Sequence, residues 1–108
     1  MHLNICIFGI SGYTGSKLIE IISKHKNVKI CAVFGSSTKG KKIKELFPKM
    51  KNLPDIVVSD YKSFNFDDVD VVFSCLPHGI FQNEIVSFIS DKVSIIDLSG
   101  DFRLDNLL

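Results

Sequence analysis

The sequence predicts an α/β fold in which parallel strands alternate with helices around one sheet. Apolar runs of strand length recur between helical patterns, and a glycine-rich segment directly follows the first run. Four runs rich in Val, Ile and Phe are typical of parallel strands buried on both faces: Leu3–Phe8, Val28–Phe34, Val69–Leu76 and Val93–Leu98. Because 108 residues form only one small core, we expect a single domain over residues 1–108, with no second domain.

A crossover helix is predicted between the first two strands, over about Gly15 to His25. Its expected packing face consists of Leu18, Ile21, Ile22 and His25. A second crossover helix is predicted between the last two strands, from the spacing of Phe81, Ile85, Phe88 and Ile89. The Lys-rich middle segment holds at most one helical turn, around Ile43 to Phe47, because Pro48 and Pro54 interrupt any longer helix.

A short apolar run, Ile56 to Val58, predicts a weak additional strand at an edge, third in sequence order. Right-handed crossovers then give a doubly wound, Rossmann-type sheet with the strand order 3-2-1-4-5. In such a sheet the winding reverses between the first and fourth strands. We therefore expect the ligand crevice at the carboxyl ends of those two strands.

Composition excludes several classes of protein. Thirteen Lys plus Arg against twelve Asp plus Glu give a net charge of +1, without the basic excess of a nucleic-acid binder. No apolar stretch approaches the ~20 residues of a membrane span, and no signal segment begins the chain. The three cysteines are far apart and lie in apolar runs, which indicates buried thiols rather than disulfides or a metal site. A cytoplasmic protein without a nucleic-acid, membrane or metal partner is expected.

The first strand runs directly into Gly9-Ile10-Ser11-Gly12-Tyr13-Thr14-Gly15, which has the spacing G-x-x-G-x-x-G and opens the first helix. A strand, a glycine turn and a helix in this order are typical of a dinucleotide site. The first glycine permits a tight turn, the second lets the backbone approach a pyrophosphate, and the third allows the helix to pack on the strand. Amides at the helix N-terminus bind the anion, and Ser11 and Thr14 add hydroxyl donors.

The segment after the second strand favours NADP over NAD. Sites that prefer NAD carry an acid there that binds the ribose hydroxyls, whereas this chain has no Asp or Glu between Glu20 and Glu45. We expect Ser36 and Ser37 near the 2′-phosphate, with Lys39 assisting. The neighbouring lysines are also consistent with an ordinary solvated loop.

The opposite lip of the crevice follows the fourth and fifth strands. Facing the nicotinamide half of the dinucleotide we expect Leu76, Pro77, His78, Gly79 and Ser99. A packing role is preferred for Cys75 over that of a nucleophile with His78 as its base, because a thiolate needs an activating environment. For His78, lining of the cleft and helix capping both stay open. We expect His25 to be a packed or boundary residue.

Four segments together resemble N-acetyl-gamma-glutamyl-phosphate reductase of arginine biosynthesis. They are the glycine turn, Leu46-Phe47-Pro48, Leu76-Pro77-His78-Gly79 and Asp97-Leu98-Ser99-Gly100-Asp101-Phe102-Arg103, in that order. Gly100 departs from the pattern, since Ala is usual there. The resemblance covers essentially the whole chain but only the amino-terminal cofactor domain of that family, whose members are about three times as long.

The resemblance implies NADPH-dependent reduction of an acyl phosphate to an aldehyde through a cysteine thioester. The nucleophilic cysteine and its histidine base belong to a later catalytic and oligomerising domain, so no catalytic residue is expected in this chain. Alone it should be inactive, with an acyl-phosphate substrate only if the missing domain is supplied, and a homo-oligomer is possible. The alternative is a stand-alone NADP-binding module or regulatory remnant without catalysis.

Overall fold

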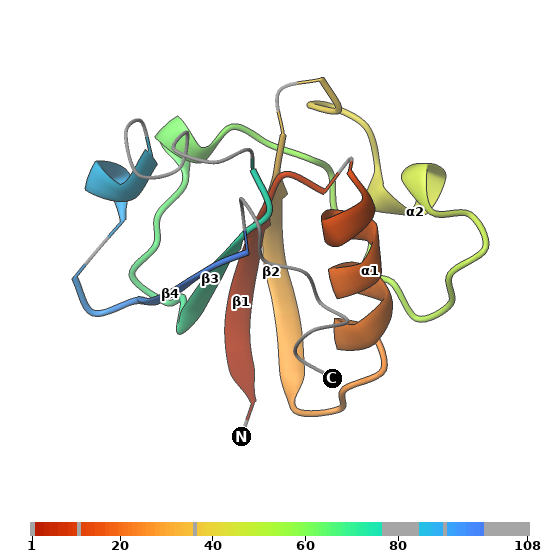
Figure 1. The fold of residues 1–108 in the computed structure, drawn as a ribbon, viewed down its shortest axis with the longest axis horizontal. Coiled ribbons are helices and arrows are strands. Elements are labelled where there is room, and N and C mark those ends of the chain that lie inside the picture. The colour runs from red at the N-terminus through yellow and green to blue at the C-terminus, as the bar shows by residue number, and fades with distance from the viewer. Residues whose placement is uncertain (1, 11, 36, 77–84, 90, 99–108) are drawn as a thin grey trace.

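The structure, a computed structural model, describes residues 2–10, 12–35, 37–76, 85–89 and 91–98. Within these residues four parallel strands form one sheet: β1 (Leu3–Phe8), β2 (Val28–Phe34), β3 (Val71–Ser74) and β4 (Ser94–Asp97), in the order β2-β1-β3-β4. The described helices are α1 (Tyr13–Ile22), α2 (Ile43–Leu46), and the 3-10 turns η1 (Tyr61–Ser63) and η3 (Val86–Phe88). Figure 1 shows α1 alongside the sheet and α2 farther out.

The predicted parallel α/β sheet is confirmed, but the order 3-2-1-4-5 is not, because residues 56–58 form no strand of it. Their backbone is engaged by the preceding loop: the Val58 amide donates to the Lys41 carbonyl at 2.8 Å, and the Ile43 amide donates to the Ile56 carbonyl at 3.0 Å. Only Ser59 reaches the sheet, through one parallel bridge to Phe34. The expected edge strand is therefore replaced by a short antiparallel contact with the loop after β2.

The last two strands are shorter than the apolar runs that predicted them. β3 covers Val71–Ser74 of the expected Val69–Leu76, and β4 covers Ser94–Asp97 of the expected Val93–Leu98. Val69 and Val93 are buried although they lie outside the strands. An apolar run therefore marks buried chain more reliably than it marks the end of the hydrogen-bonded ladder.

The sequence predicts a helix from Gly15 to His25. Helix α1 begins two residues earlier than this prediction and ends three residues earlier. At its end the amides of Lys24 and His25 donate to carbonyls three residues earlier, at 3.3 and 2.9 Å, so the last turn is tighter than an α-helix. The buried face consists of Gly15, Leu18, Ile19 and Ile22. The predicted face was wrong at His25, which is exposed, and it omitted Ile19, which is fully buried.

The second crossover helix was predicted over Phe81 to Ile89, and its first part lies outside the described residues. The described part holds the short turn η3 instead of a long helix. Ile85 and Ile89 are buried as predicted, whereas Phe88 is 48% exposed and its ring meets Tyr61 edge-on. The predicted helical turn near Ile43 is confirmed as α2.

Each face of the sheet carries its own core. Alternation along β1 sends Ile5 and Ile7 toward α1, and Cys6 and Phe8 toward the opposite face. On that opposite face Phe8 contacts the Phe34 ring at a centroid distance of 4.6 Å, and further aromatic residues from the segment before β3 pack on this pair. The two cores fix the ends of the central strands, where the candidate site lies.

Candidate dinucleotide-binding site at the carboxyl ends of the strands

The candidate site begins where β1, β2 and β3 end together. The Gly9 amide donates to the Phe34 carbonyl at 3.0 Å, and the Cys75 amide donates to the Phe8 carbonyl at 2.8 Å. These bonds bring the glycine turn, the loop after β2 and the loop after β3 to one edge of the sheet. In Figure 1 this is the edge from which α1 runs back along the sheet.

Gly9 turns the chain out of β1. Its φ is +78°, a left-handed conformation that side chains rarely adopt, and an added Cβ would lie 3.0 Å from the Cys75 carbonyl carbon and the Leu76 side chain. The first predicted glycine is therefore required by the fold itself. It also brings the end of β1 against the opposite lip of the crevice.

Gly15 allows α1 to pack on the turn. An added Cβ would lie 2.5 Å from the Gly9 carbonyl oxygen and 2.6 Å from the Ile10 Cα, which are backbone atoms that cannot move aside cheaply. The close helix-to-strand packing predicted for the third glycine is confirmed.

Gly12 differs from the other two glycines because an added Cβ would meet no atom of the described residues within 4 Å. Its backbone is ordinary extended chain, with φ −91° and ψ 179°, and it forms the N-cap of α1. Nothing in the described fold therefore requires a glycine here. The open space in front of Gly12 is the kind of approach that a bound pyrophosphate needs.

The first turn of α1 presents its backbone amides at this opening. No side chain caps the helix, and the Gly12 carbonyl accepts from the Ser16 amide at 3.0 Å. The amides of Tyr13, Thr14 and Gly15 precede the helical ladder, so an anion can bind to them. Tyr13 is 75% exposed beside the opening. Ser11, the other predicted hydroxyl donor, lies outside the described residues.

The loop after β2 forms the second part of the site. Ser37 is exposed, as a residue that contacts a ligand must be, and Ser36 lies outside the described residues. The Lys39 ammonium lies 3.5 Å from an Asp60 carboxylate oxygen, with both side chains substantially exposed. The amide of Lys62 and then the charge of Lys39 lower the pKa of Asp60. The Lys39 side chain is thus held by an exposed ion pair with Asp60. Replacing this contact by another one costs little free energy.

Sequence reasoning missed Thr38. Its Oγ1 is buried and has no hydrogen-bond partner within the described residues. It lies 2.6 Å from the position that a Cβ on Gly35 would take. The only signal in the sequence was a Gly followed three residues later by a Thr, a pattern too common to single out.

On the opposite lip, the Leu76 side chain lies against Gly9. The remaining predicted residues of this lip, Pro77, His78, Gly79 and Ser99, lie outside the described residues. Cys75 packs against the α1-side core, and burial, followed by the nearby charge of Asp97, raises the pKa of its thiol to about 12. A neutral, packed thiol agrees with the preferred packing role and not with a nucleophile.

The other two cysteines, Cys6 and Cys31, are also without disulfide bonds. All three cysteines are free, and burial raises the pKa of Cys6 to about 12. Among the described residues no three His, Cys, Asp or Glu side chains come together as a metal site. In the same part of the chain, no helix has the length and apolar character needed to cross a bilayer.

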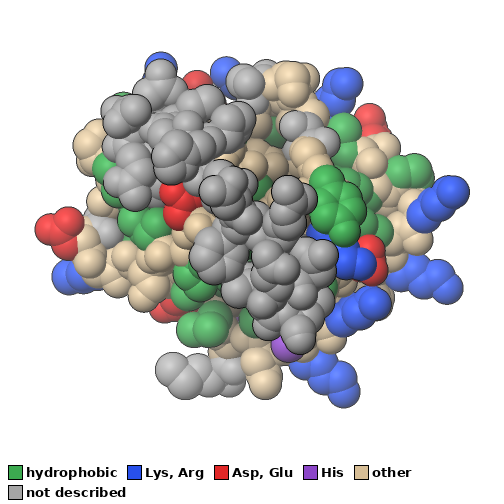
Figure 2. Space-filling model, in the orientation of Figure 1, with side chains coloured by type: hydrophobic (Ala, Val, Ile, Leu, Met, Phe, Trp, Pro, Cys, Tyr) green, Lys and Arg blue, Asp and Glu red, His purple; other side chains and the backbone are tan. Residues whose placement is uncertain are grey.

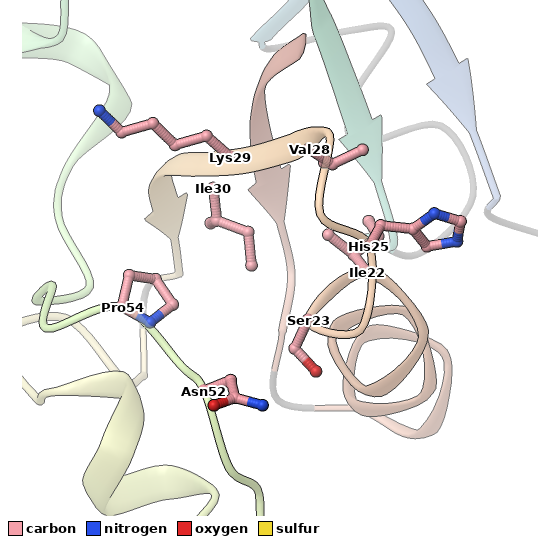
Figure 3. A pocket seen from close by; sticks show the side chains of 8 residues that line it. All are labelled: Ile22, Ser23, His25, Val28, Lys29, Ile30, Asn52 and Pro54. Atoms are coloured by element: carbon pink, nitrogen blue, oxygen red, sulfur yellow. The ribbon is translucent and has the colours of Figure 1, made fainter. Parts of the chain in front are cut away.

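A cavity of about 240 Å³ lies away from the glycine turn, between the end of α1, the start of β2 and residues 52–54. Figure 3 shows Ile30, Pro54 and Asn52 around it, while the ring of His25 and the ammonium of Lys29 point away. Because β2 begins here and the glycine turn follows the end of β1, this cavity belongs to the opposite edge of the sheet. It is separate from the candidate site.

Lysines give the side of the molecule near α2 a positive charge. Six lie between residues 39 and 51, where Glu45 is the only acid. Figure 2 shows blue side chains gathered along the right-hand edge, over α2 and its neighbouring loops. This side adjoins the loop after β2, where the sequence predicts the 2′-phosphate of NADP.

The fold and this edge define the class: a Rossmann-type domain with a glycine-rich turn between β1 and α1. Comparison with known families then gives the particular family. Residues 4–107 match the family described as semialdehyde dehydrogenase, NAD binding domain, and the chain belongs to that family.

Individual relatives agree with the resemblance seen in the sequence. The chain is 39% identical over 106 residues to N-acetyl-gamma-glutamyl-phosphate reductase of Desulforapulum autotrophicum, covering 96% of this chain and 30% of that protein. It is 35% identical to the probable chloroplastic enzyme of that name from Arabidopsis thaliana, covering 97% and 26%. The chain thus spans about three tenths of the length of the curated relatives it matches.

A solved structure confirms the fold. Aspartate semialdehyde dehydrogenase from Candida albicans, determined with NADP, superposes with a TM-score of 0.74 at 29% identity, covering 94% of this chain and 31% of that one. The predicted cofactor-binding domain is thereby confirmed as a nicotinamide dinucleotide domain.

Proposed function

We propose that this chain is the NADPH-binding part of an enzyme that reduces N-acetyl-glutamyl phosphate to its semialdehyde in arginine biosynthesis. The relatives that match over nearly the whole chain carry the name of that reductase. The observation that carries the proposal is Gly12, the one glycine of the turn whose missing side chain leaves open space. That space fits a pyrophosphate, which supports a bound dinucleotide at this turn.

In this proposal the residues of the chain bind and orient the cofactor. The free amides of Tyr13, Thr14 and Gly15 hold the pyrophosphate at the start of α1. Ser37 and Lys39 lie near the 2′-phosphate, where Lys39 exchanges its contact with Asp60 for the phosphate. Leu76 packs beside the turn and helps exclude water from the nicotinamide side. The cofactor, when bound, supplies the hydride.

The thiol that would hold the acyl group must come from elsewhere. Among the described residues the only thiol at this edge is Cys75, and its raised pKa, about 12, keeps it protonated at neutral pH. We therefore propose that the chain alone does not turn over the acyl phosphate. The nucleophile belongs to a part of the longer relatives that this chain does not match.

Nucleotide titration of the purified chain tests the proposal. The chain has no Trp, so the fluorescence of bound NADPH can be followed without overlap from indole. We expect saturable binding that is tighter for NADPH than for NADH and is absent for ATP. At a hundred times its Kd, NADPH should raise the free energy of unfolding by about 2.7 kcal/mol. Preference for ATP, or binding that Gly12→Val leaves unchanged, would contradict the assignment of the site.

A mixing experiment tests the activity. The chain is assayed for NADPH oxidation with N-acetyl-glutamyl phosphate, alone and with the remaining part of the Desulforapulum relative supplied as a separate polypeptide. We expect no turnover alone and restored turnover in the mixture. Turnover by the chain alone would show that its own residues supply the nucleophile. Tight NADPH binding with no turnover in the mixture would instead favour a module without catalysis.

A further inference from the structure

Two cysteines from neighbouring strands lie on the same face of the sheet. Cys6 belongs to β1 and Cys31 to β2, and both pack in the core opposite α1. Cys6 is fully buried, whereas Cys31 is half-buried. The two residues are far apart in the sequence, and the parallel pairing of β1 with β2 brings them together. The proposed function uses neither thiol.

A β-bulge places Cys31 on this face. The register of the two strands pairs Ile5 with Ile30 and then Cys6 with Ala32. Cys31 is therefore the extra residue of β2. Side chains normally alternate between the two faces of a strand, yet Cys31 and Ala32 follow one another on the face that carries Cys6. Ile30, just before them, lies in the core beside α1.

This pairing limits the distance between the two α-carbons. Neighbouring strands of a sheet lie about 4.8 Å apart, and one residue advances the chain by about 3.3 Å. Because Cys31 lies between the partners of Ile5 and Cys6, its Cα is displaced along the strand by less than one such step. The Cα atoms of Cys6 and Cys31 are thus less than about 6 Å apart. Disulfides span Cα separations of about 4.4–6.8 Å.

Each thiol also interacts with the backbone of the other strand. Burial, followed by the nearby Cys31, raises the pKa of Cys6 to about 12, and a hydrogen bond from the Ala32 backbone on β2 opposes this rise. Burial raises the pKa of Cys31 as well, and the charge of Lys29 and a hydrogen bond from the Ile5 backbone on β1 oppose it. The two sulfur atoms therefore both lie in the space between β1 and β2.

We propose that Cys6 and Cys31 form a reversible dithiol–disulfide site that a peroxide oxidises. The sulfur of Cys31, the more exposed of the two, attacks hydrogen peroxide, the O–O bond breaks, and a sulfenic acid and one water form. The Cys6 sulfur then attacks the Cys31 sulfur, so that the S–S bond forms, the S–O bond breaks and a second water leaves. In total the two thiols lose two electrons and two protons, which reduce the peroxide to water.

Peptide mapping of the intact chain tests this inference. The folded, reduced protein is treated with hydrogen peroxide, remaining thiols are blocked with N-ethylmaleimide in denaturant, and the chain is digested with trypsin without reductant. Cleavage after lysine puts Cys6 in residues 1–17, Cys31 in residues 30–39 and Cys75 in residues 63–92. We expect the first two peptides to be joined, with a mass two hydrogens below their sum. Dithiothreitol should separate them, and Cys75 should carry the blocking group.

Matched variants and the fold of the oxidised chain complete the test. Cys75→Ser should form the same cross-link, Cys31→Ala should form none, and Cys6→Ala should leave a Cys31 sulfenic acid that dimedone traps. Far-UV circular dichroism should be unchanged by the cross-link. The inference is overturned by thiols that do not oxidise, by a bond that includes Cys75 or joins two chains, or by a cross-link that forms only as the native spectrum is lost. None of these outcomes alters the proposed function, which nucleotide titration tests separately.

Discussion

At the scale of single residues, the structure constrains the three glycines of the turn in different ways. Gly9 is required by its φ of +78°, and Gly15 is required by backbone atoms 2.5 Å from an added Cβ. Gly12 is required by neither conformation nor packing. In the proposed site, fold and ligand constrain different members of one sequence motif, and substitutions can separate the two.

Gly12→Ala should weaken nucleotide binding without unfolding the chain. The new methyl group meets open space, so we expect a loss of less than about 1 kcal/mol of stability, from the weaker N-cap. NADPH affinity should fall at least tenfold because the methyl group occupies the phosphate approach. Fluorescence titration and thermal unfolding measure the two effects.

Gly15→Ala is the matched control. Its methyl group would lie against the Gly9 carbonyl oxygen, so we expect a loss of about 1–3 kcal/mol, the usual cost of overpacking. If Gly12→Ala destabilises the chain as much as Gly15→Ala does, the open space at Gly12 is not reserved for a ligand.

At the scale of elements, α1 connects the site to the core. Its first turn faces the opening at Gly12, and its buried side chains pack on β1 and β2. The position of the binding amides therefore depends on the packing of the same helix. Ile19 is the fully buried side chain of that helix.

Ile19→Ala should destabilise the chain by about 2–5 kcal/mol, because the cavity it leaves cannot collapse between two strands and a helix. Urea unfolding measures this loss through the shift of the midpoint. Lys17→Ala on the exposed face is the control. It removes only an exposed contact of 3.8 Å with Glu20 and should cost less than about 0.5 kcal/mol. Equal losses for both variants would refute the assigned packing face.

At the scale of the whole molecule, stability should depend on pH through the buried thiols. Burial raises the pKa of Cys6 and Cys75 in the folded chain to about 12, from an ordinary value of 9.0. The unfolded chain therefore loses these protons first. The contribution of these thiols to the free energy of unfolding is fully present below pH 9 and is lost as the pH rises toward 12.

Urea unfolding between pH 7 and pH 10.5, with the thiols kept reduced, measures this dependence. We expect the midpoint to fall above pH 9 and Cys75→Ala to make the fall shallower, because one of the thiols whose pKa is raised by burial is gone. Lys17→Ala is the control and should keep the wild-type slope. A slope unchanged by Cys75→Ala would mean that this thiol does not titrate differently on folding.

The apolar runs predicted the parallel strands, the crossover rule predicted the central place of the first strand, and the glycine spacing predicted the turn that starts α1. These features are local, since a buried strand needs a continuous apolar run and a tight turn into a helix needs glycine. The family resemblance also lay in short contiguous segments, and comparison with relatives agrees with it.

Only the tertiary structure decided the edge of the sheet and the true face of α1. Residues 56–58 are apolar enough for a strand, but their hydrogen bonds go to the loop after β2. Ile19, not His25, completes the helix face because α1 ends before His25. Such features depend on which partners backbone and side-chain groups find in space, and sequence order does not record that choice.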